Sequence, residues 1–273
     1  MSINQFTKNG KFLMLALDHR DSFKQYINKI NPDFVNNDDL ILVKKAIIDA
    51  TRENFSGVLL DPDWGYHAYT NPDKPFLLSL EKSGYTDIAG ERNTVLQYSA
   101  IQLVGWGASG AKLLVYFNPV AKKEMEHQIE VTRQALEDCQ KNNLPLFLEI
   151  VTYGNEALDK SRAEWVLESL QQFISAGIKP DVWKLEYPGS AAACAEITKL
   201  VGDTPWILLT RGEDYEIFKE QLKIALANGA VGFLAGRAIW QEIKNFDTIK
   251  LKQDFLNTVA AKRFKEICEI ALG

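Results

Sequence analysis

The segment DVWKLE (Asp181–Glu186) decides how the rest of the chain is interpreted. Turn-forming residues flank it, Ala-Gly-Ile-Lys-Pro before it and Pro-Gly-Ser shortly after it, so it predicts a short strand. The segment is apolar around Lys184, as in parallel-sheet strands that are buried on both faces. Burial lowers the pKa of a lysine, and a partly neutral lysine can condense with a ketone or aldehyde to a Schiff base. The alternative is that Lys184 pairs with a carboxylate and only fills space.

Seven other segments share this short, apolar character. They span residues 12–17, 57–60, 75–80, 111–116, 145–151, 205–210 and 231–235. Helix-like segments lie between them and after the last one. These span residues 38–54, 94–106, 121–142, 161–177, 214–228 and 240–272. Asn37 or Asp38 is the expected N-cap of the first helix, and Ser161 with Glu164 forms a capping box at the fourth.

The alternation of eight strands with helices indicates a (β/α)8 TIM barrel of the α/β class, and 273 residues suit its size. We therefore expect one barrel domain over residues 1–273. The alternative is a doubly wound open sheet. That fold lacks support because no Gly-x-Gly-x-x-Gly follows the first strand.

The composition is typical of a globular chain without a nucleic-acid or membrane partner. Hydrophobic residues make up 46% of the sequence, charged residues make up 25%, and the net charge is −5. No basic stripe is present for nucleic acid, and neither a signal segment nor a run of about 18 apolar residues is present. We expect a cytoplasmic protein that acts on a small molecule. The sequence leaves a homo-oligomer open.

Cysteines and histidines do not show the spacing of a metal site. Cys139, Cys194 and Cys268 are scattered and odd in number, which indicates a reducing compartment without a disulfide framework. The three histidines never fall at ligand spacing such as His-x-x-x-His, so no zinc site is expected. We expect no metal and no other cofactor.

Polar residues follow the predicted strands where a TIM barrel has its active site, at the C-terminal strand ends. Lys112, Glu149 and Lys184 belong to three consecutive strands, and neighbouring strands lie about 4.8 Å apart. If all three side chains point inward, the two ammonium groups repel each other and lower the pKa of Lys184 further. Glu149 can then relay protons. The alternative is a buried ionic network without chemistry, which is an expensive way to build stability.

The loops after the last two strands carry glycine and arginine together, Thr210-Arg211-Gly212 and Gly236-Arg237. These loops are the common phosphate site of the fold, because glycine lets backbone N–H groups approach the anion and arginine adds charged hydrogen bonds. The alternative is a solvated arginine at the start of a helix.

The first strand ends in Asp18-His19-Arg20. Asp18 is expected to bind a substrate hydroxyl or take part in proton transfer, and Arg20 to hold a second anionic group. For His19, which is grouped with the binding residues, a helix-cap or packing role is the alternative. Lys82 is a weaker candidate nucleophile than Lys184, because it alternates to the side opposite Glu81.

Six motifs are ALDHR (residues 16–20), EKSGY (81–85), KLLVY (112–116), FLEI (147–150), DVWKLE (181–186) and GFLAGRAIW (232–240). The first five, in this order, resemble tagatose-1,6-bisphosphate aldolases, and the sixth looks most like the related sulfofructose-phosphate aldolases. The resemblance covers nearly the whole chain. It implies a metal-free class I aldolase in which Lys184 forms the Schiff base and Glu149 relays protons. Lys112 matches the second active-site lysine of the family. Asp18 matches the strand-one aspartate, and Thr210, Gly236 and Arg237 match the phosphate site.

Two positions depart from the family pattern and leave the substrate open. His19 stands where glutamine is usual, and Arg211 where a small residue is usual. DVWK and RGED (residues 211–214) instead resemble the aldolase-like domain for 5-keto-2-deoxygluconate-6-phosphate. The functional hypothesis is reversible cleavage of a phosphorylated ketose to dihydroxyacetone phosphate and an aldehyde. The rivals are a metal-dependent aldolase and a non-catalytic barrel that senses sugar phosphates.

Overall fold

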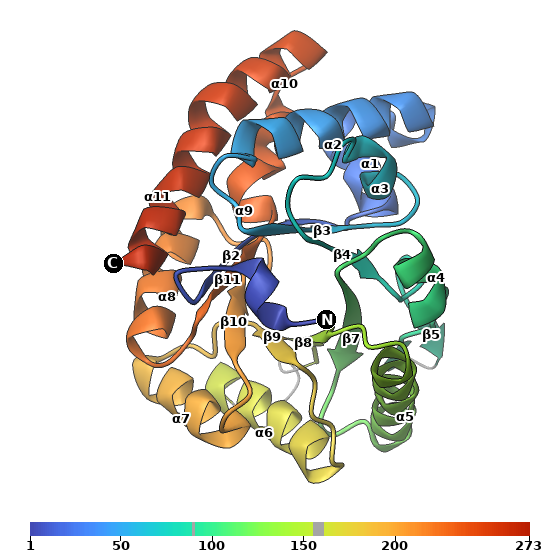
Figure 1. The fold of residues 1–273 in the computed structure, drawn as a ribbon, viewed down its shortest axis with the longest axis vertical. Helices are drawn as coiled ribbons and strands as arrows, with labels where there is room; N and C mark the ends of the chain where they lie inside the picture. Colours follow the sequence, from blue (N-terminus) through green and yellow to red (C-terminus); the bar gives the residue numbers. More distant parts are fainter. Residues whose placement is uncertain (89–90, 155–160) are drawn as a thin grey trace.

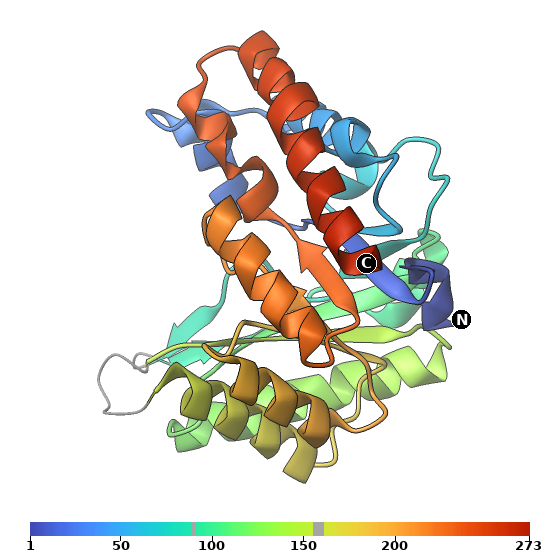
Figure 2. The same cartoon turned by 90° about the vertical axis from the view of Figure 1, so that its left-hand side faces the viewer.

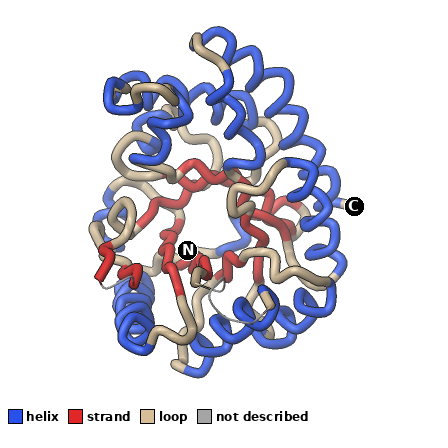
Figure 3. Tube along the Cα trace, turned by 180° about the vertical axis from the view of Figure 1, so that it is seen from behind, coloured by secondary structure: helices blue, strands red, loops and turns tan. Residues whose placement is uncertain are grey.

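Eight parallel strands close into a barrel in the computed structural model, which describes residues 1–88, 91–154 and 161–273 (Figures 1 and 3). The strands neighbour one another in the order β2, β11, β10, β9, β8, β7, β4 and β3, and a β2–β3 pairing closes the ring. The fold confirms the predicted (β/α)8 barrel. The barrel strands are β2 (Lys11–Leu17), β3 (Gly57–Leu60), β4 (Phe76–Ser79), β7 (Gly110–Phe117), β8 (Leu146–Thr152), β9 (Val182–Leu185), β10 (Trp206–Leu209) and β11 (Gly232–Ala235).

Helices surround the barrel, as Figure 3 shows. The helices of the β/α units are α1 (Asp21–Ile27), α2 (Asn37–Thr51), α3 (Gly65–Ala68), α4 (Ala100–Gly105), α5 (Lys122–Lys141), α6 (Arg162–Ser175), α7 (Ala191–Val201), α8 (Tyr215–Ala227) and α9 (Arg237–Trp240). The chain then continues through η4 (Gln241–Asn245), α10 (Ile249–Phe255), the π-helical turn η5 (Leu256–Ala260) and α11 (Ala261–Leu272). Short elements complete the set: η1 (Ile3–Phe6), β1 (Thr7–Lys8), η2 (Pro32–Phe34) and a hairpin of β5 (Thr86–Ile88) and β6 (Glu91–Asn93). No helix in the described ranges is both long and apolar enough to cross a membrane.

The N-terminal end of the barrel is plugged, which leaves the other end for a site. Element η1 lies across this end (Figure 2), and the Phe6 ring packs edge-on against Phe147 with centroids 5.3 Å apart. A Cβ at Gly57 would come within 2.8 Å of Phe6, and one at Gly110 within 3.4 Å. Glycine at these two positions therefore makes room for the plug.

Strand alternation determines which side chains face the barrel interior. On β8, Phe147 belongs to the inner apolar cluster while Leu148 packs in the outer one. On β9, Val182 is inside and Trp183 outside. Because side chains on a strand alternate with period two, Glu149 follows Phe147 inward and Lys184 follows Val182 inward.

Two predicted boundaries are corrected by the structure. The N-cap of α2 is Asn36 rather than Asn37 or Asp38, and its side chain accepts a hydrogen bond from the Asp39 amide at 2.9 Å. The helix predicted over residues 94–106 is limited to Ala100–Gly105. The residues before it lie against the end of β4, where the Gln97 amide donates to the Leu80 carbonyl at 2.9 Å. This long-range backbone pairing overrides the local helical pattern.

Candidate active site

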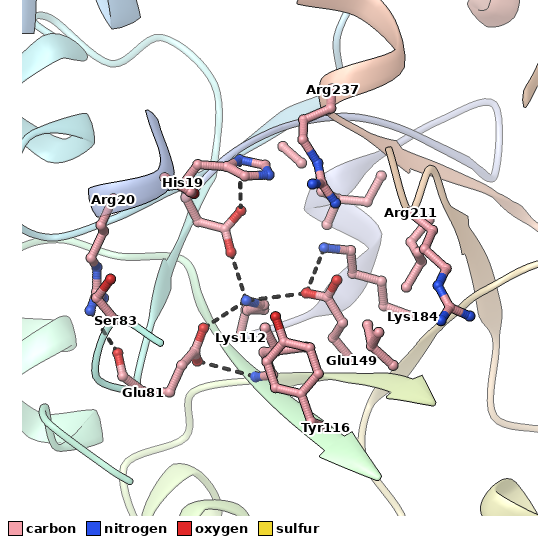
Figure 4. A pocket seen from close by; sticks show the side chains of 18 of the residues that line it. His19, Arg20, Glu81, Ser83, Lys112, Tyr116, Glu149, Lys184, Arg211 and Arg237 are labelled. Carbon is pink, nitrogen blue, oxygen red and sulfur yellow. Dashed lines mark hydrogen bonds and ion pairs between the residues drawn. The ribbon is translucent and has the colours of Figure 1, made fainter. Parts of the chain in front are cut away.

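A pocket of about 400 Å³ opens at the C-terminal ends of the strands (Figure 4). Most of the predicted site residues line it, together with residues from the loops after β2 and β4. The predicted residues in its wall are Asp18, His19, Arg20, Lys112, Glu149, Lys184, Thr210, Arg211, Gly236 and Arg237. The sequence thus brings candidates from six strands to one cavity, and only Gly212 of the predicted set is outside its lining.

Lys184, Glu149 and Lys112 meet in the floor of the pocket. The Lys184 Nζ donates a hydrogen bond to Glu149 Oε2 at 2.7 Å, and Lys112 Nζ lies 3.1 Å from the same oxygen. Glu149 is paired in register with Lys184 across β8 and β9, which explains the close approach. All three are buried, yet all three line the cavity. The carboxylate lies between the two amines, so the predicted repulsion between the ammonium groups is offset by a shared anion.

Lys112 is the most heavily paired cation of the site. Its Nζ also donates to Asp18 Oδ2 at 2.6 Å and to Glu81 Oε1 at 2.7 Å. Burial lowers the pKa of Lys112, but Asp18, Glu149 and Glu81 outweigh it and hold the pKa well above its ordinary value. Burial likewise raises the pKa of Asp18, but Lys112 and Lys184 outweigh it and hold the pKa well below its usual range. Lys112 is therefore a fixed cation and Asp18 a fixed anion.

Glu81 completes this network and was not among the predicted site residues. It follows β4, and its second oxygen, Oε2, accepts a hydrogen bond from the Leu114 amide at 3.1 Å. The available signal was its position directly after a predicted apolar strand, which it shares with Asp18. Sequence alone did not show that its partner is Lys112.

His19 stands as a neutral imidazole beside this network. Burial lowers the pKa of His19 to about 3, assisted by Arg237, Lys44 and Lys184 and opposed by Asp18. The Nδ1 atom lies 4.0 Å from Asp18 Oδ1. The ring packs edge-on against Trp240 with centroids 5.1 Å apart. His19 therefore lines the pocket, as predicted, and it also packs against Trp240, as the alternative proposed.

Arg20 has partners that the sequence did not reveal. It is 5% exposed, and its guanidinium donates to the Glu81 carbonyl at 2.9 Å and to Ser79 Oγ at 2.7 Å. Its Nε lies 3.2 Å from Asp63 Oδ2. The charge expected to hold a second anionic group is already compensated inside the protein. This arrangement favours a supporting role, in which Arg20 fixes the loop that carries Glu81.

Arg211 departs from its predicted role in the same way. Its guanidinium pairs with Glu186 and donates to the Thr152 carbonyl at 2.9 Å. Figure 4 shows it directed away from Lys184. Because Glu186 is 1% exposed, solvent ions cannot replace Arg211 as its partner. If Arg211 moved away, the buried charge of Glu186 would be left uncompensated. Arg211 therefore belongs to the wall of the site rather than to its open anion-binding surface.

Of the three predicted arginines, Arg237 is the one whose charge has no partner in the described ranges. It forms no hydrogen bond or ion pair with any residue in the described ranges, and it points into the pocket above Lys184 (Figure 4). Its guanidinium lies against Gly212, where a Cβ would meet Cζ at 3.0 Å. Gly212 has φ of +81°, so it serves here both by its conformation and by its lack of a side chain. Thr210 and Gly236 line the same pocket.

The described part of the chain contains no group of three or more His, Cys, Asp or Glu side chains suited to a metal ion. The carboxylates of Asp18, Glu81 and Glu149 are instead arranged around the Lys112 ammonium.

The chain is similar in sequence to known aldolases. A family model described as DeoC/LacD family aldolase matches residues 12–242. Tagatose 1,6-diphosphate aldolase 2 of Enterococcus faecalis is 30% identical over 268 residues, which cover 86% of this chain and 80% of that protein. Tagatose 1,6-diphosphate aldolase of Staphylococcus aureus strain MW2 is 29% identical over 272 residues, which cover 88% and 83%.

Solved aldolase structures share the fold. A Schiff-base-forming fructose-1,6-bisphosphate aldolase aligns with a TM-score of 0.68 at 21% identity, over 98% of both chains. An archaeal fructose-1,6-bisphosphate aldolase, whose catalytic lysine is bound to the carbinolamine intermediate, aligns with the same TM-score and identity over 99% of both chains. At this identity the likeness concerns the barrel itself.

Proposed function

The chain belongs to the DeoC/LacD family of aldolases, and on that premise we propose that it cleaves a phosphorylated ketose reversibly through a Schiff base on Lys184. Aldolases are lyases that break the bond between the α and β carbons of a carbonyl compound. The observation that carries the proposal is the buried Lys184 amine, which faces the pocket with a carboxylate oxygen at 2.7 Å. An amine and an adjacent base within hydrogen-bond reach are what imine chemistry requires.

Glu149 moves the protons of the imine-forming steps. It takes a proton from the Lys184 ammonium, and the free amine then attacks the ketone carbon to give a carbinolamine. The protonated Glu149 returns the proton to the departing hydroxyl, which leaves as water, and a protonated imine remains. Lys112 stays cationic throughout these transfers, with its Nζ 3.1 Å from Glu149 Oε2.

The protonated imine then accepts the electron pair of the broken bond. Glu149 removes the proton of the hydroxyl on the fourth carbon, the bond between the third and fourth carbons breaks, and the aldehyde leaves. The enamine that remains takes the proton back at the third carbon, and hydrolysis of the imine releases the ketone fragment. Asp18, fixed as an anion, is placed to accept a hydrogen bond from a substrate hydroxyl.

The phosphate of the ketone fragment is assigned to Arg237 with Thr210, Gly236 and the backbone at Gly212. Arg237 is directed into the cavity, and no described residue pairs with its charge. The loops after the last two strands are the usual phosphate site of the fold. The relatives named for tagatose 1,6-diphosphate support this ketose class, with dihydroxyacetone phosphate as the ketone product.

Reductive trapping tests this proposal. Borohydride added together with tagatose 1,6-bisphosphate or dihydroxyacetone phosphate should leave a covalent adduct on Lys184, located by peptide mass spectrometry. Lys184→Met should abolish the adduct and lower kcat by about 10⁴-fold or more, since it removes the amine that forms the imine. Lys45→Met, which removes an exposed lysine paired with Asp49, is the control.

Activity that survives in Lys184→Met, or that disappears on treatment of the wild type with a chelator, would reject the mechanism. Aldehyde release from a panel of ketose phosphates, including 5-keto-2-deoxygluconate-6-phosphate, then identifies the substrate. A barrel that only senses sugar phosphates would bind members of the panel and release no aldehyde.

A further inference from the structure

Tyr116 is a pocket residue to which neither the sequence motifs nor the mechanism above assign a role. It lies on β7 four residues after Lys112, so strand alternation directs both side chains inward. Figure 4 shows the ring among the pocket side chains near Lys112 and Glu149. A polar ring at this position faces whatever occupies the cavity above the lysines.

Contacts with a tyrosine and an arginine hold the Tyr116 ring in place. We define the tyrosine–arginine cluster as Tyr85, Arg92, Tyr116 and Tyr153. The Tyr85 ring packs edge-on against Tyr116 with centroids 5.1 Å apart. The Arg92 guanidinium lies 5.4 Å from the Tyr116 centroid, 5.0 Å from that of Tyr85 and 4.5 Å from that of Tyr153. Such cation–π contacts, made with three rings at once, restrict the orientation of each ring.

The phenol hydroxyl of Tyr116 has no hydrogen-bond partner among the described residues. Burial raises the pKa of Tyr116, with Glu149 adding to the rise, so the group remains a neutral donor. A fixed ring with a free donor, facing a cavity, is the arrangement of a ligand contact rather than of core packing.

The barrel order determines which half of a ketose this donor would meet. With β2 counted as the first strand of the barrel, the next are β3, β4 and β7, so β7 is the fourth strand and β11 is the eighth. Strands β7 and β11 therefore lie on opposite sides of the barrel. Arg237 follows β11, whereas Tyr116 lies on β7, with Glu149 and Lys184 on the strands between them. A ketose held by its phosphate at Arg237 and by its carbonyl carbon at Lys184 extends its remaining carbons toward β7.

We propose that the Tyr116 hydroxyl binds an oxygen of the departing aldehyde half of the sugar, and that Arg92 is a positioning residue which holds the Tyr116 ring for this contact. This inference rests on the proposed aldolase function. It assigns β7 and strand β6, which carries Arg92, to recognition of the aldehyde, whereas β10 and β11 recognise the ketone fragment.

The experiment separates the two halves of the reaction. Cleavage of the full ketose phosphate requires the aldehyde half, whereas exchange of the C3 proton of dihydroxyacetone phosphate with D₂O, followed by NMR, uses only the ketone half. Tyr116→Phe should lower kcat/KM for cleavage by roughly 10-fold and leave the exchange rate within about twofold of wild type. Tyr66→Phe removes another tyrosine hydroxyl that lies outside the pocket lining, and it is the matched control.

Arg92 variants test the positioning role. Arg92→Met should reproduce the same split between cleavage and exchange, and its effect should not add to that of Tyr116→Phe in the double variant. Arg92→Lys, which keeps the cation, should recover part of the cleavage rate.

An equal fall of cleavage and exchange in Tyr116→Phe would overturn the inference, because the hydroxyl would then act at the imine. Wild-type rates in both assays would overturn it as well. Absence of any borohydride adduct in the wild type would instead reject the Schiff-base mechanism itself, so the two failures are distinguishable.

Discussion

Two buried glutamates each lie between two cations, and they differ in what surrounds them. Glu149 lies between Lys112 and Lys184, and Glu186 lies between Arg162 and Arg211. The second oxygen of Glu149, Oε1, accepts no hydrogen bond from a described residue, and the side chain faces the pocket. Glu186 instead accepts from Thr152 through both the amide and the hydroxyl, and lies outside the pocket lining.

The difference shows how one charge pattern serves either chemistry or stability. Lysine can give up its proton, whereas arginine stays charged under all ordinary conditions. Around Glu149 the cations are lysines and one carboxylate oxygen is open to the pocket. Around Glu186 the cations are arginines and both oxygens are occupied. The first cluster is therefore suited to proton transfer, and the second to holding β8 and β9 to their loops.

A matched pair of amide substitutions tests directly whether Glu149 serves catalysis and Glu186 serves stability. Glu149→Gln should lower kcat by about 10²- to 10³-fold, because a neutral amide cannot relay protons. Glu186→Gln should leave kcat within about threefold and instead lower Tm by about 5 °C, since it uncouples two arginines from a buried anion. Steady-state cleavage assays and calorimetric melting of the two variants check these expectations.

Glu242→Gln is the control for this pair, because it removes a partly exposed partner of Arg263 and should change little. If Glu149→Gln melted early with near-normal kcat, or Glu186→Gln lost its activity while melting normally, the assignment of chemistry to one cluster and stability to the other would be wrong.

At Lys112, which supports the first cluster without carrying its chemistry, the expected effect is on stability. Lys112→Met leaves Asp18 and Glu81 without their buried cation, and the free energy of unfolding should fall by about 3 kcal/mol near neutral pH. The native pKa of Asp18 lies below its ordinary 3.8, so its contribution is present above that pH and is lost as the pH falls. The native pKa of Lys112 lies above 10.5, so its contribution is lost as the pH rises beyond that value.

The Tm difference between wild type and Lys112→Met should therefore be largest between about pH 5 and 10 and shrink on both sides. Melting curves in a pH series measure it. A difference that stays constant from pH 3 to pH 11 would show that packing, not ion pairing, is what Lys112 provides.

The sequence predicted those parts of the site that depend on strand alternation. Lys112, Glu149 and Lys184 occupy inward positions of three neighbouring strands, and the structure brings them together as the period of two requires. The barrel itself followed from the same pattern of apolar segments separated by helices.

The remaining parts depend on partners that are distant in the sequence. Arg20 and Arg211 were expected to face a ligand, but Asp63 and Glu186 compete for them, and no local pattern reveals that competition. Glu81 was missed for the same reason, because its partner, Lys112, lies on the next strand of the barrel. The short helix α4 was overextended because backbone pairing with Leu80 is a long-range contact.

The smallest effect is expected at His19, which borders the first cluster without pairing in it. Burial lowers the pKa of His19 from 6.5 to about 3. Below pH 6.5 the unfolded chain therefore binds a proton at His19, whereas the native protein keeps this imidazole neutral until the pH falls to about 3. Protonation therefore favours unfolding, and His19→Gln should raise Tm at pH 4.5 relative to its effect at pH 8. Cleavage should change only a few-fold, because glutamine keeps a neutral donor and acceptor at this position. His67→Gln, at an exposed histidine outside the pocket lining, is the matched control. An equal gain at both pH values would mean that the imidazole is not kept neutral by its surroundings, and that its place beside Asp18 is a matter of packing alone.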